Sequence, residues 1–325
     1  MSNNNFQTVP SENKLGEEVE LPPLADIPVI DLSKAKGTQN ERRELVDQLM
    51  KAGQEYGFVQ VINHGVPKEL MEDTMAMYKE FFHLPYEEIS AYITNTTNLT
   101  YENNKPTYTR DTNRGAIGHG LHPLEAQMKT WPEKPARYRK VVAAYVKEIS
   151  KVALKVLELF AEGLGLENKY FEVERSDNAY FKSYYYSLCS DPTSTLGLLT
   201  HADVNLLTIV QQDNFGLQFL KDGKWLAIDV IPNALVFGVA AQLQVISNGK
   251  LKSRDHRVVK NPKTSRLSIC IFVSPSRKCI VEPAKTLIND SNPPLYKSYT
   301  YGEFMDDYLT KMGANAETIS TYFKL

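Results

Sequence analysis

The chain has 325 residues, of which 42% are apolar and 23% are charged, and its formal net charge is −2. This length allows one large domain or two of ordinary size, and the near-neutral charge gives no reason to expect nucleic acid or a membrane surface as a partner. No run approaches the roughly 18 consecutive apolar residues that a transmembrane helix requires.

Cysteine content and the N-terminal segment bear on the compartment. Three cysteines, Cys189, Cys270 and Cys279, form no secreted-type disulfide framework, and an odd number suits a reducing compartment. Residues 1–24 are polar, without the apolar stretch of a signal peptide or the Arg-rich character of a transit peptide. We therefore expect a cytoplasmic protein.

The first third of the chain predicts two strand–helix pairs after a flexible leader at residues 1–25. Strands are expected at 28–32 and 58–62, and amphipathic helices at 40–56 and 67–82. Apolar residues repeat at helical spacing along the two helices. These candidate core residues are Leu45, Leu49, Ala52, Leu70, Met71, Met75, Tyr78 and Phe82.

Two segments of opposite character follow. Residues 95–120 are rich in Asn, Thr and Tyr, with Gly115 and Gly118 as breakers, which indicates loops and short strands of the kind that carry specificity. Residues 135–164 give the longest helix pattern, with apolar side chains at three- and four-residue steps.

From residue 179 to about 280 the apolar period is two, and short strands alternate with turn clusters. This pattern predicts a β-sandwich or barrel, followed by a final helix at 301–311. We expect one compact unit with four parts: the leader at 1–25, a helical region at 26–170, a β core at 171–290, and a C-terminal helix and tail at 291–325.

The stretch LGLLTHADVNLLTIV, residues 196–210, carries the most informative pair. His201 and Asp203 are two residues apart in a strand pattern, so both side chains project from the same face. A third candidate ligand, His256, occurs later. Two His and one Asp that leave the opposite side of an ion open form the facial triad of non-haem Fe(II) oxygenases. Arg266 and Ser268 follow, a cation and a hydroxyl on another strand pattern.

These motifs, in this order, resemble the plant Fe(II)- and 2-oxoglutarate-dependent dioxygenases over nearly the whole chain. The resemblance includes residues 27–32, the segment YGFVQVINHGVP at 56–67, and WPEKP at 131–135. The N-terminal half and WPEKP are similar to an alkaloid-modifying member of the family.

The resemblance implies a double-stranded β-helix (jelly-roll) core, mainly β within an α+β fold, flanked by helices from the N-terminal half. It implies Fe(II) at His201, Asp203 and His256, with 2-oxoglutarate and O₂ as co-substrates and ascorbate as reductant. Arg266 and Ser268 would bind the distal carboxylate of 2-oxoglutarate, and Tyr186 would hydrogen-bond the same molecule. A C-terminal helix would help to close the mouth of the site.

Two departures from the family pattern bear on this expectation. Tyr184 replaces an asparagine that normally lies beside the keto acid and the iron. The usual Asn-(Ile/Leu)-Gly-Asp is replaced by Gly-Val-Ala-Ala at 238–241, so a polar group near the metal and an acidic turn are lost. A non-catalytic jelly-roll protein that binds a small molecule therefore stays open as an alternative.

The remaining histidines have plainer interpretations. His64 lies in the turn Asn-His-Gly and is expected to be structural. His119 and His122 form an H-x-x-H pattern that could indicate a second metal, but no Cys or carboxylate partner lies nearby in the sequence, so packing or substrate contact is favoured.

The substrate pocket is expected at the barrel mouth, with an aromatic lining that suits a flat or polycyclic apolar substrate. The candidate lining residues are Tyr108, Asn113, Tyr184, Phe237 and Phe272. The loop 105–115 offers Asp111 as its single acidic residue, which does not favour a cationic tropane amine.

The function expected from the sequence is oxidation of an unactivated C–H bond of a plant specialised metabolite, with an alkaloid as the first candidate. Hydroxylation, desaturation and ring closure or epoxidation all remain open. Alternatives are the same chemistry on a flavonoid, terpenoid or hormone, and a zinc hydrolase, which the Arg266-x-Ser268 pair disfavours. We expect a monomer whose partner is its small-molecule substrate.

Overall fold

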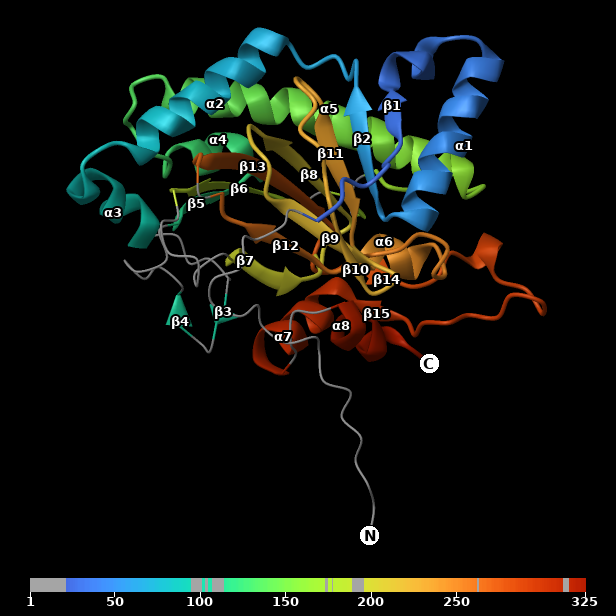
Figure 1. The fold of residues 1–325 in the computed structure, drawn as a ribbon. Coiled ribbons are helices and arrows are strands. Elements are labelled where there is room, and N and C mark those ends of the chain that lie inside the picture. The colour runs from blue at the N-terminus through green and yellow to red at the C-terminus, as the bar shows by residue number, and fades with distance from the viewer. Residues whose placement is uncertain are drawn as a thin grey trace.

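Two β-sheets packed face to face form the centre of the molecule (Figure 1). The computed structural model describes residues 22–94, 101–102, 105–106, 114–172, 175–176, 178–188, 196–261, 263–311 and 316–325. In these ranges the larger sheet has seven strands, in the order β1 (Val29–Asp31), β2 (Phe58–Ile62), β11 (Leu235–Val239), β8 (Leu207–Gln212), β13 (Arg266–Ser274), β6 (Asn178–Tyr186) and β5 (Arg114–Gly120).

A four-stranded sheet covers one face of the larger sheet. Its order is β10 (Lys224–Ala227), β9 (Leu217–Lys221), β12 (His256–Val259) and β7 (Leu196–His201). Side chains from both sheets form one apolar cluster, which includes Tyr184, Val210, Phe219 and Val258. We call the face of the larger sheet that carries Tyr184 and Val210 its interior face. Two further pairs are β3 (Tyr101–Glu102) with β4 (Lys105–Pro106), and β14 (Ile280–Val281) with β15 (Tyr299–Thr300).

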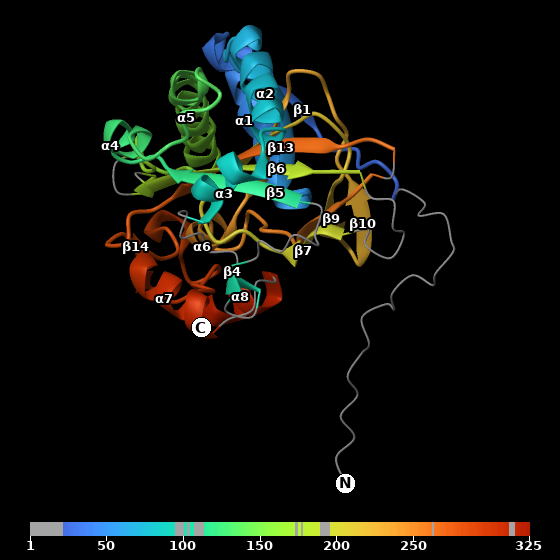
Figure 2. The same cartoon turned by 90° about the vertical axis from the view of Figure 1, so that its left-hand side faces the viewer.

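Helices cover the opposite face of the larger sheet, which we call the helix face. Figures 1 and 2 show α1, α2 and α5 on this side, and α7 and α8 on the other side of the sheet. The helices are α1 (Gln39–Glu55), α2 (Lys68–Phe82), α3 (Tyr86–Thr94), α4 (Leu124–Met128), α5 (Tyr138–Gly163), α6 (Ala241–Ile246), α7 (Tyr301–Lys311) and α8 (Ala316–Phe323), with 3₁₀ turns η1 (Leu32–Lys36) and η4 (Lys285–Leu287).

The long helices form where the sequence predicts them, and for the expected reasons. Thr38 and Glu41 make a capping box at the start of α1, which satisfies backbone N–H groups that have no partner within the helix. The predicted face of α1 is buried, and α5 buries a continuous apolar stripe against the sheet and against α1 and α2. On α2, Phe81 is fully buried whereas Phe82 is partly exposed, so the core face is rotated slightly from the predicted one.

Residues 95–120 were expected to form loops and short strands with Gly115 and Gly118 as breakers, and the strand β5 runs through both glycines. Gly115 and Gly118 do not break it, because β5 pairs with β6 along its whole length. The missing side chains make room for neighbours: a Cβ on Gly118 would overlap the ring and hydroxyl of Tyr180, and one on Gly115 would meet the Phe82 ring at 2.9 Å. Close approach of aromatic rings, rather than a turn, therefore explains these glycines.

Strands from the first third of the chain complete the β core. β2 pairs with β11, and β5 with β6, so the region 26–170 is not only a helical layer on the core but contributes three strands to the larger sheet. Four of the described helices were not expected: α3 follows α2, the short α4 precedes α5, and the other two lie later in the chain. The short α6 interrupts the β region, and α8 follows the predicted α7, with Phe323 of α8 stacked on Tyr299.

Replacing Gly118 with alanine should overpack the space that Tyr180 fills and lower the free energy of unfolding by about 1–3 kcal/mol. Gly120→Ala is the matched control on the same strand, because its Cβ would meet only the end of the Gln127 side chain, at 3.2 Å, which can swing aside. Urea unfolding of both variants measures the difference. Equal destabilisation would contradict the packing explanation.

Candidate metal centre

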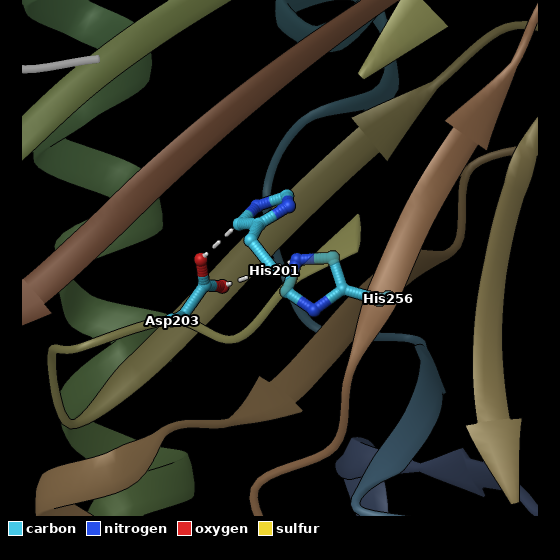
Figure 3. Close-up of side chains that lie close together, drawn as sticks. All are labelled: His201, Asp203 and His256. Atoms are coloured by element: carbon cyan, nitrogen blue, oxygen red, sulfur yellow. Dashed lines mark ion pairs between the residues drawn. The ribbon is translucent and has the colours of Figure 1, made fainter. Parts of the chain in front are cut away.

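Three side chains meet where β7 and β12 lie next to each other (Figure 3). His201 ends β7 and His256 begins β12, and the two residues are direct partners in the antiparallel ladder. Asp203 follows in the loop that leads to β8. Its Oδ1 lies 3.7 Å from His201 Nε2 and its Oδ2 lies 3.7 Å from His256 Nε2. Within the described ranges, this is the one group of three or more His, Cys, Asp or Glu side chains whose possible metal-ligand atoms all lie within 4.8 Å of one another.

The hydrogen bonds of the two imidazoles fix which nitrogen is available. His201 Nδ1 lies 2.8 Å from the carbonyl oxygen of Leu199, and His256 Nδ1 lies 3.2 Å from that of Arg254. A carbonyl oxygen only accepts, so each Nδ1 carries the proton and each Nε2 presents its lone pair toward Asp203.

The site fits a divalent metal ion better than a direct ion pair. At 3.7 Å the carboxylate and the imidazoles are too far apart for a hydrogen bond, whereas an ion between them would reach all three ligand atoms. Burial, and then the neighbouring His256, lower the pKa of His201 to about 4, so the ring is neutral as a ligand requires. The side chains of His201 and Asp203 are 23% and 13% exposed, so the site is partly accessible to solvent.

The loop that carries Asp203 is held by side chains around it. Thr208 on β8 donates its hydroxyl hydrogen to Asp203 Oδ2 at 2.6 Å, which leaves Oδ1 for the metal and orients the carboxylate. Asn205 in the same loop donates to the carbonyl of Leu207 at 2.8 Å, with both groups buried. Neither residue was singled out from the sequence, because their role depends on the path of the loop.

The segment Gly-Val-Ala-Ala at 238–241, which departs from the family pattern, continues into backbone N–H groups that bind the Asp203 loop. The amide N–H groups of Ala240, Ala241 and Gln242 donate to the carbonyls of Leu206, Asp203 and Asn205 at 3.0–3.1 Å. Gln242 also donates its side-chain amide to Val204 and accepts from the Tyr299 hydroxyl, both at 2.8 Å. Because any residue supplies a backbone N–H, the departure leaves the loop fully supported.

Arg266 is fixed on the interior face of β13 and is only 2% exposed. Its Nη1 donates to Ser268 Oγ at 3.0 Å, its Nη2 to Gln212 Oε1 at 2.9 Å, and its Nε to the carbonyl of Asn214 at 3.1 Å. The ring of Tyr186 lies 5.3 Å from the guanidinium carbon. The three residues expected at the keto-acid site are therefore brought together, in a dry environment where a charged group binds an anion strongly.

The charges of Arg266 and Asp203 both affect the pKa of the Cys270 thiol. Burial raises the pKa of Cys270 to about 12, and the next contributions come from Arg266, which lowers it, and Asp203, which raises it. The strand register gives the geometry: Phe272, on the same face of β13 as Arg266, pairs with Thr208, whose hydroxyl donates to Asp203.

The candidate substrate residues do not all lie together. Tyr184 and Phe272 belong to the apolar cluster on the interior face. The structure corrects the expectation that Phe237 lines the substrate pocket. Phe237 is buried in the core on the helix face, and its neighbour Val236 points to the interior. Tyr108 and Asn113 lie outside the described residues.

The other histidines follow their plainer interpretations. His119 is buried, stacks on Trp131, and shares a 2.7 Å hydrogen bond with the Tyr138 hydroxyl, while His122 is exposed. Burial lowers the pKa of His119 to about 3, so it is a neutral core residue. His64 lies in the predicted turn, within hydrogen-bond distance of the Asn233 carbonyl.

Replacing Thr208 with valine should weaken binding of a divalent metal ion by roughly 10- to 100-fold, because the Asp203 carboxylate loses the partner that orients it. Thr208→Ser keeps the hydroxyl and should bind nearly as tightly as the parent protein. Calorimetric titration of metal-free protein with Fe(II) under nitrogen measures both affinities. Equal affinities for the valine and serine variants would show that the hydrogen bond has no role.

Two family models match the chain. Residues 177–275 match the 2OG-Fe(II) oxygenase superfamily, and residues 27–140 match the N-terminal region described as non-haem dioxygenase in morphine synthesis. The described His201, Asp203, His256 and Arg266 all lie within the first match.

Relatives agree with these matches. Hyoscyamine 6-dioxygenase of Hyoscyamus niger is 42% identical over 313 residues, covering 90% of this chain and 88% of the relative. Flavanone 3-dioxygenase 2 of Oryza sativa subsp. japonica is 34% identical, covering 88% of this chain and 84% of the relative. The crystal structure of JOX2 in complex with 2OG, Fe and JA superposes with a TM-score of 0.81 at 27% identity, covering 95% of this chain and 92% of that one.

The fold and the triad agree with the family resemblance expected from the sequence, and the alkaloid-modifying hyoscyamine 6-dioxygenase is among the relatives. With its His201, Asp203 and His256 triad intact, the chain belongs to the plant 2OG-Fe(II) dioxygenase family.

Proposed function

We propose that this oxygenase oxidises an unactivated C–H bond of a plant specialised metabolite, with an alkaloid as the first candidate. The observation that carries the proposal is a triad whose Nε2 atoms face one carboxylate, together with a buried Arg266 on β13, the strand that pairs with Thr208 beside Asp203. The 42% identity to hyoscyamine 6-dioxygenase supports the alkaloid class.

His201, Asp203 and His256 would hold Fe(II), and these three ligands leave the other positions of the ion open. The bound iron supplies activation of dioxygen, coupled to conversion of 2-oxoglutarate to succinate and CO₂. The chain contributes the orientation of the ligands through Leu199, Arg254 and Thr208.

Arg266 would bind the distal carboxylate of 2-oxoglutarate, with Ser268 and Tyr186 beside it. A guanidinium has five N–H groups, and the described partners engage three of them, one on each nitrogen. In the described chain, one N–H on each terminal nitrogen is left for a ligand. Two parallel donors match a carboxylate in a bidentate contact.

The substrate would occupy the interior near Tyr184 and Phe272, whose rings give an apolar wall. The same chemistry on a flavonoid, terpenoid or hormone is the alternative, supported by the 34% identity to flavanone 3-dioxygenase 2. Hydroxylation, desaturation and ring closure each remain compatible with this arrangement. In this proposal the enzyme works as a cytoplasmic monomer, as its charge and cysteine content suggest.

The protein should form succinate from 2-oxoglutarate in the presence of Fe(II) and ascorbate, at a rate that rises when a pooled alkaloid, terpenoid and flavonoid extract is added. His201→Ala should abolish the rise, because the ion loses one of its three ligands. The assay quantifies succinate and uses mass spectrometry to find the oxidised product. Succinate formation that is equal in the variant would refute the assignment of the triad.

Arg266→Gln should raise the KM for 2-oxoglutarate by roughly 10- to 100-fold, because a charge-assisted contact is worth about 1.5–3 kcal/mol. Arg137→Gln is the control, since the ion pairs that Arg137 forms with Asp73 and Glu80 in the described chain are exposed. Steady-state succinate kinetics give KM, and Fe(II) titration tests whether the metal site survives. An unchanged KM would move the keto-acid carboxylate away from Arg266.

A further inference from the structure

Gln212, the last residue of β8, lies beside Arg266. Gln212 and Ser268 are direct partners in the ladder between β8 and β13, so both side chains lie on the interior face. Arg266 comes two residues before Ser268 on β13 and therefore shares this face. The amide oxygen Oε1 of Gln212 accepts a hydrogen bond from Arg266 Nη2 at 2.9 Å.

The groups on its two sides fix the orientation of the Gln212 amide. A guanidinium only donates hydrogen bonds, so Gln212 must present its oxygen to Arg266 and its nitrogen to the opposite side. There Nε2 donates to the backbone carbonyl of Asp229 at 3.3 Å. Gln60 on β2, which is 4% exposed, donates to the same carbonyl at 2.7 Å. Because a carbonyl only accepts, a rotated Gln212 amide would lose both of its contacts, and the network permits one arrangement.

Every acceptor that Arg266 contacts in the described chain is neutral. These acceptors are the amide of Gln212, the hydroxyl of Ser268 and the backbone carbonyl of Asn214. Arg266 is 2% exposed, and a buried charge that has no counter-charge is costly. The surroundings of Arg266 therefore suit the binding of an anion from outside the chain.

The two carboxylates next to this network are engaged elsewhere. Asp213 turns its Oδ1 to a backbone N–H of β13 at 2.7 Å, and its Oδ2 lies 2.8 Å from Lys79 Nζ on α2. Asp229 turns its Oδ1 to the next backbone N–H along the chain, also at 2.7 Å. In the described chain, neither aspartate accepts a hydrogen bond from Arg266, so neither neutralises it directly.

We propose that Gln212 is a positioning residue for 2-oxoglutarate, which orients Arg266 through a neutral acceptor and so leaves the charge of Arg266 for the distal carboxylate. This inference rests on the proposed function, in which Arg266 binds that carboxylate, and it deepens it. In Gln212→Glu, a carboxylate of nearly the same size would pair with the guanidinium and compete with the ligand. Selectivity for a dicarboxylate would then be lost, while the metal end of the site would stay intact.

The test compares two keto acids on protein that is loaded with Fe(II) under nitrogen, where binding occurs without turnover. 2-Oxoglutarate carries the distal carboxylate, whereas 2-oxopentanoate has the same carbon chain without it. Calorimetric titration gives the dissociation constant of each acid for the parent protein, Gln212→Glu and Gln212→Leu. The control is Gln48→Glu, which makes the same charge change on an exposed residue of α1. Fe(II) titration and thermal unfolding verify that each variant is folded and holds the ion.

Gln212→Glu should bind 2-oxoglutarate roughly 10- to 100-fold more weakly and 2-oxopentanoate as tightly as the parent protein, because only the dicarboxylate needs the free charge of Arg266. Gln212→Leu adds no charge but removes the acceptor that holds Arg266, so it should weaken binding of 2-oxoglutarate alone, by about two- to tenfold. Gln48→Glu should match the parent protein for both acids. The leucine variant keeps the inference testable even if Gln212→Glu fails to fold.

Equal weakening of both keto acids, or unchanged binding of 2-oxoglutarate by either variant at position 212, would overturn the inference. The succinate assay separates it from the proposed function. Selective loss of 2-oxoglutarate binding in the Gln212 variants, without succinate formation by the parent protein in the presence of the extract, would refute the proposed function and leave the role of Gln212 intact. Succinate formation without any change of selectivity in those variants would have the opposite meaning.

Discussion

Two hydrogen bonds to the backbone determine what this site can bind. His201 and His256 each use Nδ1–H to reach the carbonyl of the residue two positions earlier, and their strands are paired so that the rings lie 4.2 Å apart. Both Nε2 lone pairs therefore converge on Asp203 before any ion arrives. Such preorganisation means that the ligands need little rearrangement on binding. Without the pairing of β7 and β12, His201 and His256 would not lie next to each other.

The Asp203 loop and Arg266 are held mostly by groups that a sequence motif does not include. Backbone amides at the start of α6 hold the Asp203 loop, and Gln212, Asn214 and Ser268 hold Arg266. Gly216 permits the close approach, because a Cβ there would lie 2.9 Å from Arg266 Cδ and 2.7 Å from the Val259 carbonyl, at a φ of +153°. The departure at 238–241 is therefore compensated by backbone hydrogen bonds, which do not depend on side-chain identity.

The sequence predicts most of the long elements and the triad, because helical spacing and the alternation around His201 are clear. It does not predict which side chains of β11 point to the interior. All five residues of Leu235–Val239 are buried, so the strand has no alternation of apolar and polar residues. This explains the misplacement of Phe237. Gly115 and Gly118 were expected to be breakers because glycines are common in turns. The reason for Gly118 cannot be found in the sequence, because the Tyr180 ring for which it makes room lies on another strand.

The interleaving of early and late strands in one sheet affects how the chain reaches its native state. β2 at residues 58–62 finds its antiparallel partner in β11 at residues 235–239, and β5 is aligned by β6. During synthesis the first strands are exposed long before their partners leave the ribosome, and contacts of such high sequence separation form slowly. The N-terminal segment is therefore the part of the nascent chain that most depends on protection by chaperones, and truncation after α5 would leave β2 and β5 with unpaired edges.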